Sequence, residues 1–189
     1  GTWLMSGAAA TAEAMGFCGF EFLVLDMEHV PVDVPQAADI LRAIAGTPAA
    51  PIVRLPWNDQ IVVKRVLDAG APTLMFPFVQ SAEEAQRAVS YTRYPPHGVR
   101  GVAAVHRASR YGRTPGYLAQ ANDQIGIVIQ LETPQALASL AQIAAVPGVD
   151  ALFVGPGDLA AALGHLGDIS HPEVQQTLAA AAKAARAQS

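Results

Sequence analysis

One stretch decides the fold: Gly126-Ile127-Val128-Ile129-Gln130-Leu131-Glu132-Thr133-Pro134. Its continuous apolar run predicts a strand buried on both faces, as in a parallel sheet. Gln130 and Glu132 are two residues apart, so they point to the same side of that strand. Thr133 and Pro134 then open a helical pattern. A carboxylate at the end of a buried strand is costly unless something compensates it, so we expect Glu132 to have a partner.

A second stretch of the same kind offers that partner: Ala151-Leu152-Phe153-Val154-Gly155-Pro156-Gly157-Asp158-Leu159. It is another buried strand, and the carboxylate of Asp158 follows its C-terminal end. The two stretches have the form of neighbouring βα units, and the carboxyl ends of parallel strands meet at one edge of a sheet. We therefore expect Glu132 and Asp158 to converge.

The whole chain alternates between strand and helix patterns, which predicts βαβ units around a parallel sheet. Residues 94–115 interrupt the alternation with a long loop rich in Pro, Gly and Arg. Strands are expected at 2–6, 22–26, 50–54, 73–78, 126–131 and 151–154, and helices at 8–15, 34–45, 59–67, 81–92, 134–144, near 158–163 and at 172–187.

Six strands would suffice for a doubly wound sheet, whereas a (β/α)8 TIM barrel needs eight strands and typically ~250 residues. No GxGxxG follows the first strand, so the dinucleotide-binding fold lacks its fingerprint. Polar residues gather at the C-terminal strand ends, the catalytic face of a barrel. We expect an α/β fold of the (β/α)8 TIM barrel type: one domain over 1–189, incomplete at both ends, without its last two βα units. The polar residues are Asp26, Glu28, His29, Arg54, Gln130, Glu132 and Asp158.

Composition indicates a soluble globular protein. The 189 residues are 51% hydrophobic and 15% charged, with net charge −4, which argues against a nucleic-acid partner or a basic membrane surface. No run approaches the ~18 apolar residues of a membrane span. The one cysteine, Cys18, cannot form an internal disulfide and suits the cytoplasm. The low charge and many alanines favour a homo-oligomer.

Six motifs together carry a resemblance to the HpcH/HpaI family of class II pyruvate aldolases, which includes 4-hydroxy-2-oxoheptanedioate and 2-dehydro-3-deoxyglucarate aldolases. The similarity runs in order along essentially all 189 residues. Members of that family are usually longer than this chain and have two more barrel strands. The resemblance also implies that the protein assembles as a trimer or hexamer. The motifs are Leu25-Asp26-Met27-Glu28-His29, Val53-Arg54-Leu55-Pro56-Trp57-Asn58-Asp59, Gly70-Ala71 with Leu74-Met75-Phe76-Pro77, Arg93-Tyr94-Pro95-Pro96-His97-Gly98-Val99-Arg100-Gly101, Gln130-Leu131-Glu132-Thr133 and Gly155-Pro156-Gly157-Asp158-Leu159.

Glu132 and Asp158 are the candidate metal ligands. Two carboxylates, completed by waters and substrate oxygens, suit Mg²⁺, Mn²⁺ or Co²⁺. The resemblance implies that this pair binds the divalent ion, which pyruvate then chelates through its keto and carboxylate oxygens. The alternative is that Glu132 caps the next helix and Asp158 is an ordinary N-cap.

Residues 155–158 form a strand-to-helix turn whose backbone N–H groups could seat a carboxylate. The resemblance assigns this turn, with Gly157 and Asp158, to the pyruvate carboxylate, and Gln130 is a further candidate for substrate binding. The alternative is a tight βα turn that needs glycine for its backbone conformation. Both interpretations can hold together.

Arg54 ends a buried strand, where a guanidinium needs an anionic partner. The resemblance implies that Arg54 polarises the keto oxygen and stabilises the enolate. The alternative is a structural salt bridge to Asp26 or Glu28.

His29 is the candidate general base, because a neutral imidazole beside the metal could take a proton from bound water or, through it, from substrate. The resemblance supports this role and pairs the histidine with Asp68, which would orient its other ring nitrogen. Asp26 is the alternative orienting acid.

Arg107 lies in the long loop, and long loops in compact domains are usually functional or disordered. The resemblance implies that Arg107 meets the far carboxylate of the acceptor aldehyde. Arg110 and Arg113 are close enough to compete for this role, and a solvated charged loop is the alternative.

A class I aldolase needs a Schiff-base lysine at a strand end, but Lys64 and Lys183 both fall on predicted helices. The metal route is therefore preferred, and the resemblance implies a divalent-metal-dependent aldolase that makes or cleaves 4-hydroxy-2-oxo acids through the enolate of pyruvate or hydroxypyruvate and an aldehyde. Two alternatives stay open: a citrate-lyase-β-like Mg²⁺-dependent acyl-CoA lyase, and a non-catalytic barrel that acts as a binding module.

Overall fold

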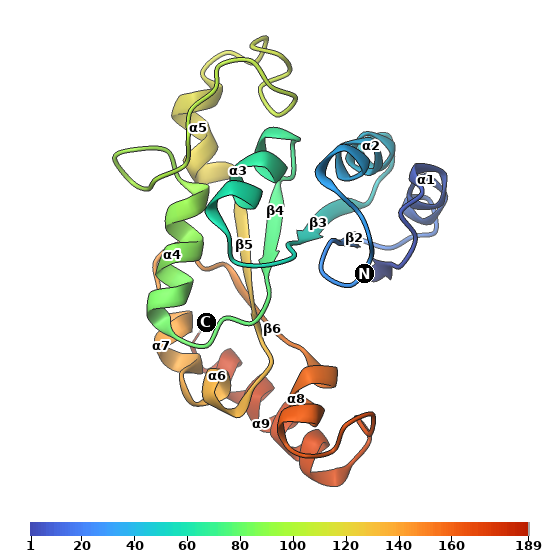
Figure 1. Ribbon diagram of the computed structural model, residues 1–189, viewed down its shortest axis with the longest axis vertical. Coiled ribbons are helices and arrows are strands. Elements are labelled where there is room, and N and C mark those ends of the chain that lie inside the picture. Colours follow the sequence, from blue (N-terminus) through green and yellow to red (C-terminus); the bar gives the residue numbers. More distant parts are fainter. Residues whose placement is uncertain (189) are drawn as a thin grey trace.

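The computed structural model describes residues 1–188, and the strands there form one all-parallel sheet. The six strands are β1 (Thr2–Leu4), β2 (Phe22–Asp26), β3 (Ala50–Arg54), β4 (Thr73–Phe76), β5 (Gly126–Leu131) and β6 (Ala151–Val154). The helices are α1 (Ala9–Gly16), α2 (Val34–Ile44), α3 (Gln60–Asp68), α4 (Ala82–Thr92), α5 (Tyr117–Gln124), α6 (Pro134–Ala138), α7 (Leu140–Ala144), α8 (Pro156–Ala162) and α9 (Pro172–Arg186). Figure 1 labels these elements.

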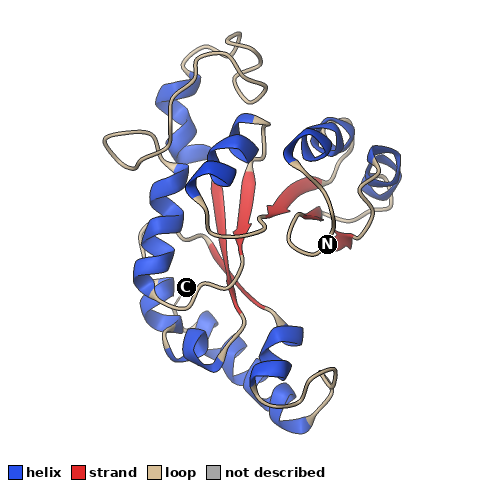
Figure 2. Ribbon diagram, viewed as in Figure 1, coloured by secondary structure: helices blue, strands red, loops and turns tan. Residues whose placement is uncertain are grey.

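The strands lie side by side in the same order as in the chain, β1 to β6. Each crossover therefore steps in the same direction, and right-handed crossovers then place every helix on one side of the sheet. A doubly wound sheet would reverse its strand order midway, so that alternative is excluded. Figure 2 shows the helices around the outside of the strands.

The expectation of a (β/α)8 TIM barrel is wrong for this chain. The described residues form an open half-barrel, a six-stranded sheet that curls but does not close. The curl brings β1 and β6 near each other: the rings of Trp3 in β1 and Phe153 in β6 meet edge to face, with centroids 5.8 Å apart. Strand twist bends the sheet, but six βα units cover only part of the circumference that eight strands would close.

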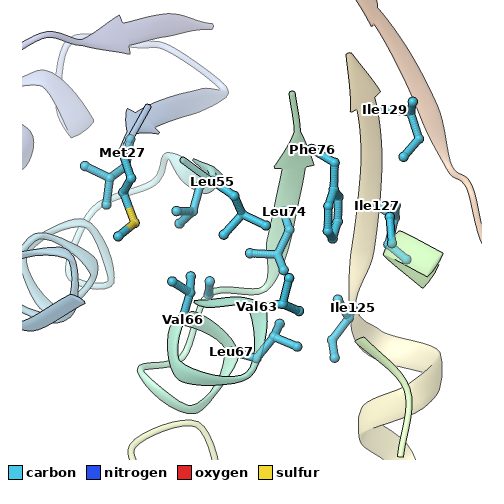
Figure 3. Close-up of a cluster of buried hydrophobic side chains, with 14 of the residues drawn as sticks. Met27, Leu55, Val63, Val66, Leu67, Leu74, Phe76, Ile125, Ile127 and Ile129 are labelled. Carbon is cyan, nitrogen blue, oxygen red and sulfur yellow. The ribbon is translucent and has the colours of Figure 1, made fainter. Parts of the chain in front are cut away.

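The two faces of the sheet differ because successive side chains alternate. In β5, Ile127, Ile129 and Leu131 are fully buried against the helices. The intervening positions, Val128 and Gln130, face the concave side together with Glu132. Figure 3 shows the helix side of the sheet, where Leu74 and Phe76 of β4 and isoleucines of β5 pack with Val63, Val66 and Leu67 of α3.

Local capping explains several helix starts. The side chain of Asp59 accepts hydrogen bonds from the N–H groups of Ile61 and Val62, and Thr133 accepts one from Ala136. Such caps satisfy N–H groups that the helix leaves free. Among the described residues, no helix has the length and apolar character needed to cross a membrane.

Three differences from the sequence expectations stand out. The helix α5 follows the long loop and was not predicted, because only Ala121 of it is buried and it therefore lacks a strong apolar period. The helix expected over 134–144 breaks at Ser139 into α6 and α7. The strands β1 and β4 each end two residues earlier than expected.

Candidate active site

The carboxyl edge of the sheet gathers most of the predicted site residues on the concave side. Asp26 ends β2 opposite Arg54, which ends β3 in register with it. Gln130 and Glu132 follow along β5, and the N–H of Gly155 donates to the carbonyl of Leu131 just below the start of α8. Parallel pairing thus converts sequence positions far apart into neighbours at one edge.

Arg54 is held by two carboxylates. Its Nε and Nη2 donate to Oδ1 and Oδ2 of Asp26 at 2.9 and 2.7 Å, a bidentate pair. Its Nη1 lies 2.9 Å from Oε2 of Glu28, and the guanidinium stacks over Trp3, 4.5 Å from the ring centroid. The salt bridge foreseen as a structural alternative is therefore present with both acids, and it fixes the plane of the guanidinium at the edge of the site.

Asp26 anchors the segment that carries His29. It is fully buried, and its Oδ1 also accepts the N–H groups of Glu28 and His29 at 2.9 and 3.3 Å. Burial alone would raise the pKa of Asp26, but the hydrogen bonds from Arg54 and from these N–H groups hold it below its usual value. Asp26 is thus a charged anchor of the loop.

Glu132 is a second buried acid of this edge, with only 1% of it exposed. It accepts hydrogen bonds from Nε2 of Gln130 at 2.6 Å and from the N–H of Phe78 at 2.9 Å. Burial, together with the negative charges of Glu28 and Asp158, raises the pKa of Glu132 to about 7, although the N–H of Phe78 opposes the shift. Burial likewise raises the pKa of Glu28.

These residues fit a divalent cation. Three carboxylates, Glu28, Glu132 and Asp158, act on one another electrostatically, and Arg54 already bonds two acids of its own. Hard oxygen donors of this kind suit Mg²⁺, Mn²⁺ or Co²⁺. Oε1 of Gln130 is buried without a hydrogen-bond partner, so it offers a further polar atom beside Glu132.

Gly155 and Gly157 keep space open at the start of α8. A Cβ on Gly155 would lie 2.6 Å from Oε1 of Glu132, so only glycine allows the chain to pass this close to the acid. A Cβ on Gly157 would meet nothing within 4 Å. The first turn of α8, which carries Asp158, therefore faces free space.

His29 sits at the mouth of the site, with 60% of its side chain exposed and Nε2 3.9 Å from Oε2 of Glu28. A recess of about 400 Å³, lined by residues 27–33, opens beside it. The imidazole is thus accessible to substrate or water. The ring is near Glu28, and the backbone N–H of His29 bonds to Asp26, whereas Asp68 pairs with other residues.

Asp68 and Arg107 lie away from this group. Asp68 ends α3, which runs back to the amino edge of the sheet, and pairs there with Arg100 at 2.8 Å and His106 at 3.7 Å. Arg107 donates from Nη1 to the carbonyl of Ala69 at 2.8 Å. In Figure 1, α5 and the loop before it lie at the top, whereas α8 lies at the bottom. A single chain therefore does not bring Asp68 or Arg107 to Glu132.

The sequence did not reveal three contributors to the site. Phe78 has the positive φ of 54° that L residues rarely adopt, and this turns its N–H towards Glu132. Its ring stacks with Trp57 at 6.1 Å. Trp3 supports Arg54. Only the position of Phe78 gave a signal, because it ends the strand expected at 73–78 and residues at carboxyl strand ends face the site.

Similarity to known proteins agrees with this arrangement. The chain is 57% identical over 175 residues to 2-dehydro-3,6-dideoxy-6-sulfogluconate aldolase of Pseudomonas putida, covering 93% of this chain and 69% of that protein. It is 49% identical over 178 residues to 5-keto-4-deoxy-D-glucarate aldolase of Salmonella newport, covering 94% of this chain and 70% of that protein.

The fold has an experimental counterpart in a crystal structure of an HpcH/HpaI aldolase/citrate lyase family protein from Burkholderia cenocepacia J2315. The TM-score is 0.93 at 47% identity, over 97% of this chain and 75% of that one. The family model for HpcH/HpaI aldolase/citrate lyase matches residues 1–189. The chain therefore belongs to the HpcH/HpaI aldolase/citrate lyase family and is an aldolase, a carbon–carbon lyase.

Proposed function

We propose that this aldolase uses a divalent cation to make or cleave 4-hydroxy-2-oxo acids through the enolate of pyruvate or hydroxypyruvate and an aldehyde. The observation that carries the proposal is the buried Glu132 beside Asp158, with its pKa raised to about 7. An acid so placed is stable as an anion only with a nearby positive charge. A divalent ion held by Glu132 and Asp158 would supply that charge and polarise the oxygens of the 2-oxo acid.

The surrounding residues supply the remaining roles. The free N–H groups at the start of α8, around Gly157, are suited to bind the substrate carboxylate. Gln130 orients Glu132 through its 2.6 Å hydrogen bond and can offer Oε1 to substrate. Arg54, fixed by Asp26 and Glu28, keeps N–H groups available for the keto oxygen as it becomes an enolate. His29 at the mouth takes the proton.

The acceptor is proposed to carry a negative charge at its far end. The names of the two curated relatives specify a sulfonated and a dicarboxylic sugar acid, so both have a second acidic group remote from the 2-oxo acid. Arg107 is the proposed contact for that group. The identity to aldolases favours this chemistry over acyl-CoA cleavage and over a non-catalytic binding module.

The position of Asp68 and Arg107 at the amino edge requires a second copy of the chain for this proposal. We therefore include a homo-oligomer, trimeric or hexameric, in which these residues of one protomer face His29 of another. The exposed free Cys18 and the small-molecule chemistry fit a cytoplasmic enzyme.

The test is pyruvate release from a panel of 4-hydroxy-2-oxo acids, with and without EDTA and with Mg²⁺, Mn²⁺ or Co²⁺ restored. Cleavage that stops in EDTA and returns with the metal is expected, and substrates with a terminal carboxylate or sulfonate should be preferred. Full activity in EDTA after exhaustive dialysis would refute the metal route.

A further inference from the structure

A group of metal-binding residues lies outside the aldolase site, where α8 connects to α9. His165 follows α8, His171 caps α9, and Glu173 stands in the first turn of α9. One ligand atom from each lies within 4.8 Å of the others, and among the described residues these three form the group with that property. Nε2 of His165 is 2.9 Å from Oε2 of Glu173.

The backbone presets these three positions. The N–H of His165 donates to the carbonyl of Ala160 at 2.8 Å, which fixes it to the end of α8. Gly164, with a φ of +86°, allows the chain to turn there. The N–H of Asp168 bonds back to His165, and the N–H of His171 bonds to Asp168. The connection is therefore built to hold the two histidines together.

The ion pair between His165 and Glu173 does not explain why His171 packs against them. The rings of His165 and His171 stack with centroids 3.5 Å apart and planes 17° from parallel. Imidazole rings packed this closely bring two nitrogen donors that commonly bind metals to one place. Part of the His165 side chain, 23%, and more than half of the Glu173 side chain, 57%, are exposed, so an ion can enter from solvent.

We propose that His165, His171 and Glu173 bind a first-row transition-metal ion, Zn²⁺ or Co²⁺, that links α8 to α9. Two imidazoles and a carboxylate favour such ions over Mg²⁺ and leave a fourth position for water. A tetrahedral site needs ligand atoms roughly 3.3 Å apart. Nε2 of His165 and Oε2 of Glu173 are already that close. A ligand atom of His171 lies within 4.8 Å of both, so binding requires its ring to move and to give up the hydrogen bond that it accepts from the N–H of Glu173.

This site is chemically distinct from the proposed aldolase site, although α8 also carries Asp158. The carboxylates of Glu132 and Asp158 are hard donors, whereas the new site has two borderline nitrogen donors. The two sites favour different ions, so binding at one can be tested separately from binding at the other.

The experiment is a titration of the metal-stripped full chain with Co²⁺, followed by visible absorption and calorimetry in excess Mg²⁺. Glu132→Gln with Asp158→Asn removes the hard donors, and one equivalent of Co²⁺ should still bind with the absorption bands of a nitrogen-ligated ion. Adding His165→Gln, or separately Glu173→Gln, should weaken this binding by about tenfold or more, since even partners outside the first ligand shell are worth 10–100-fold. His97→Gln, which changes an exposed histidine elsewhere, is the control and should bind like its parent.

Two results would overturn the proposal: no Co²⁺ or Zn²⁺ binding in the background variant at micromolar protein, or binding that His165→Gln and Glu173→Gln leave unchanged. Circular dichroism checks that each variant is folded. If the background variant does not fold, the stoichiometry is measured in the unmodified protein, where Glu173→Gln must remove one equivalent while leaving aldolase activity intact. An unchanged stoichiometry there contradicts the site equally.

Discussion

At the scale of single residues, the candidate site depends on acids buried where water cannot solvate them. Glu132 is 1% exposed and is met by Gln130, Phe78 and two other carboxylates. Without a cation, the protein stabilises the protonated form of this group. At neutral pH this burial disfavours the charged carboxylate, and a cation bound beside Glu132 would offset that cost.

The first prediction concerns pH. In the metal-free protein the pKa of Glu132 is about 7, above the ordinary value of 4.5, so the folded state binds more protons than the unfolded state between these values. Stability should therefore fall as pH rises through that window, by on the order of 3 kcal/mol from this group. Thermal unfolding in EDTA at several pH values measures it.

Glu132→Gln provides the control, because the amide is neutral throughout. The variant should gain stability relative to the unmodified protein as pH rises from about 4.5 to about 7, and it should lose divalent-cation binding in calorimetry. A constant difference in melting temperature, or full cation affinity in the variant, would contradict the assignment of Glu132.

The second prediction is that Arg54→Lys lowers kcat by roughly 10²–10³, as removal of one oxyanion donor does. Lysine keeps the charge but loses the planar fork that bonds Asp26 twice. The contacts with Asp26 and Glu28 mean that melting temperature will fall as well. Exchange of the pyruvate methyl protons, measured per folded molecule by NMR, should fall in parallel with kcat.

Arg65→Lys, an exposed position on α3, is the matched control and should change neither rate nor stability. If folded Arg54→Lys exchanges the pyruvate methyl protons at the rate of the unmodified protein, Arg54 does not stabilise the enolate. It is then only an ion-pair partner of Asp26 and Glu28.

At the scale of elements, the junction of β5, β6 and α8 positions the site. Gly155 pairs with Leu131 through its N–H and lets β6 pass close to Glu132. The helix then begins at Pro156, a residue that suits the first helical turn. A short strand, a glycine and a proline thus place Asp158 relative to Glu132.

The third prediction compares two alanine substitutions at this junction. In Gly155→Ala the new Cβ would lie 2.6 to 2.9 Å from atoms of Glu132 and Gln130, so these side chains must move. We expect Mn²⁺ affinity to fall by about tenfold or more, because displaced ligand supports cost 10–100-fold. Calorimetry and melting temperature measure the two effects.

Gly157→Ala is the comparison, because a Cβ there meets nothing within 4 Å. Its melting temperature and Mn²⁺ affinity should stay near those of the unmodified protein, while KM for the 2-oxo acid rises if this turn seats the carboxylate. Equal Mn²⁺ affinity in the two variants would show that Gly155 does not support Glu132.

At the scale of the whole molecule, the predicted residues divide between opposite edges of the half-barrel. Arg54, Glu132 and Asp158 are at the carboxyl edge, whereas Asp68 and Arg107 are at the amino edge. Helix α3 spans the sheet between them. If all act in one reaction, they must come from different copies.

The fourth prediction is complementation between inactive variants. His29→Ala and Arg107→Ala should each be nearly inactive on an acidic substrate, and co-expression of the two should restore measurable activity. Mixed oligomers would contain sites with both residues intact, one from each chain. Separately purified variants give the baseline, and two copies of Arg107→Ala with different tags give the control. Activity that never exceeds that baseline would place Arg107 outside the site.

The sequence by itself determined where most strands lie and which polar residues stand at their carboxyl ends. Strands β2, β3, β5 and β6 lie at the predicted residues, because long apolar runs bounded by glycine, proline and capping residues leave few local alternatives. The position of Arg54 and Glu132 at strand ends follows from the same pattern. These features depend on residues close together in the sequence, so they can be predicted without knowing the tertiary contacts.

Only the tertiary structure decided how far the sheet closes and which polar groups meet. The curl of six strands, the simultaneous pairing of Arg54 with both Asp26 and Glu28, and the separation of Asp68 from His29 depend on packing between segments far apart in sequence. The positive φ of Phe78 and the raised pKa of Glu132 arise from that packing. A local pattern cannot encode them, because burial and electrostatic interactions depend on which segments surround a residue once the chain has folded.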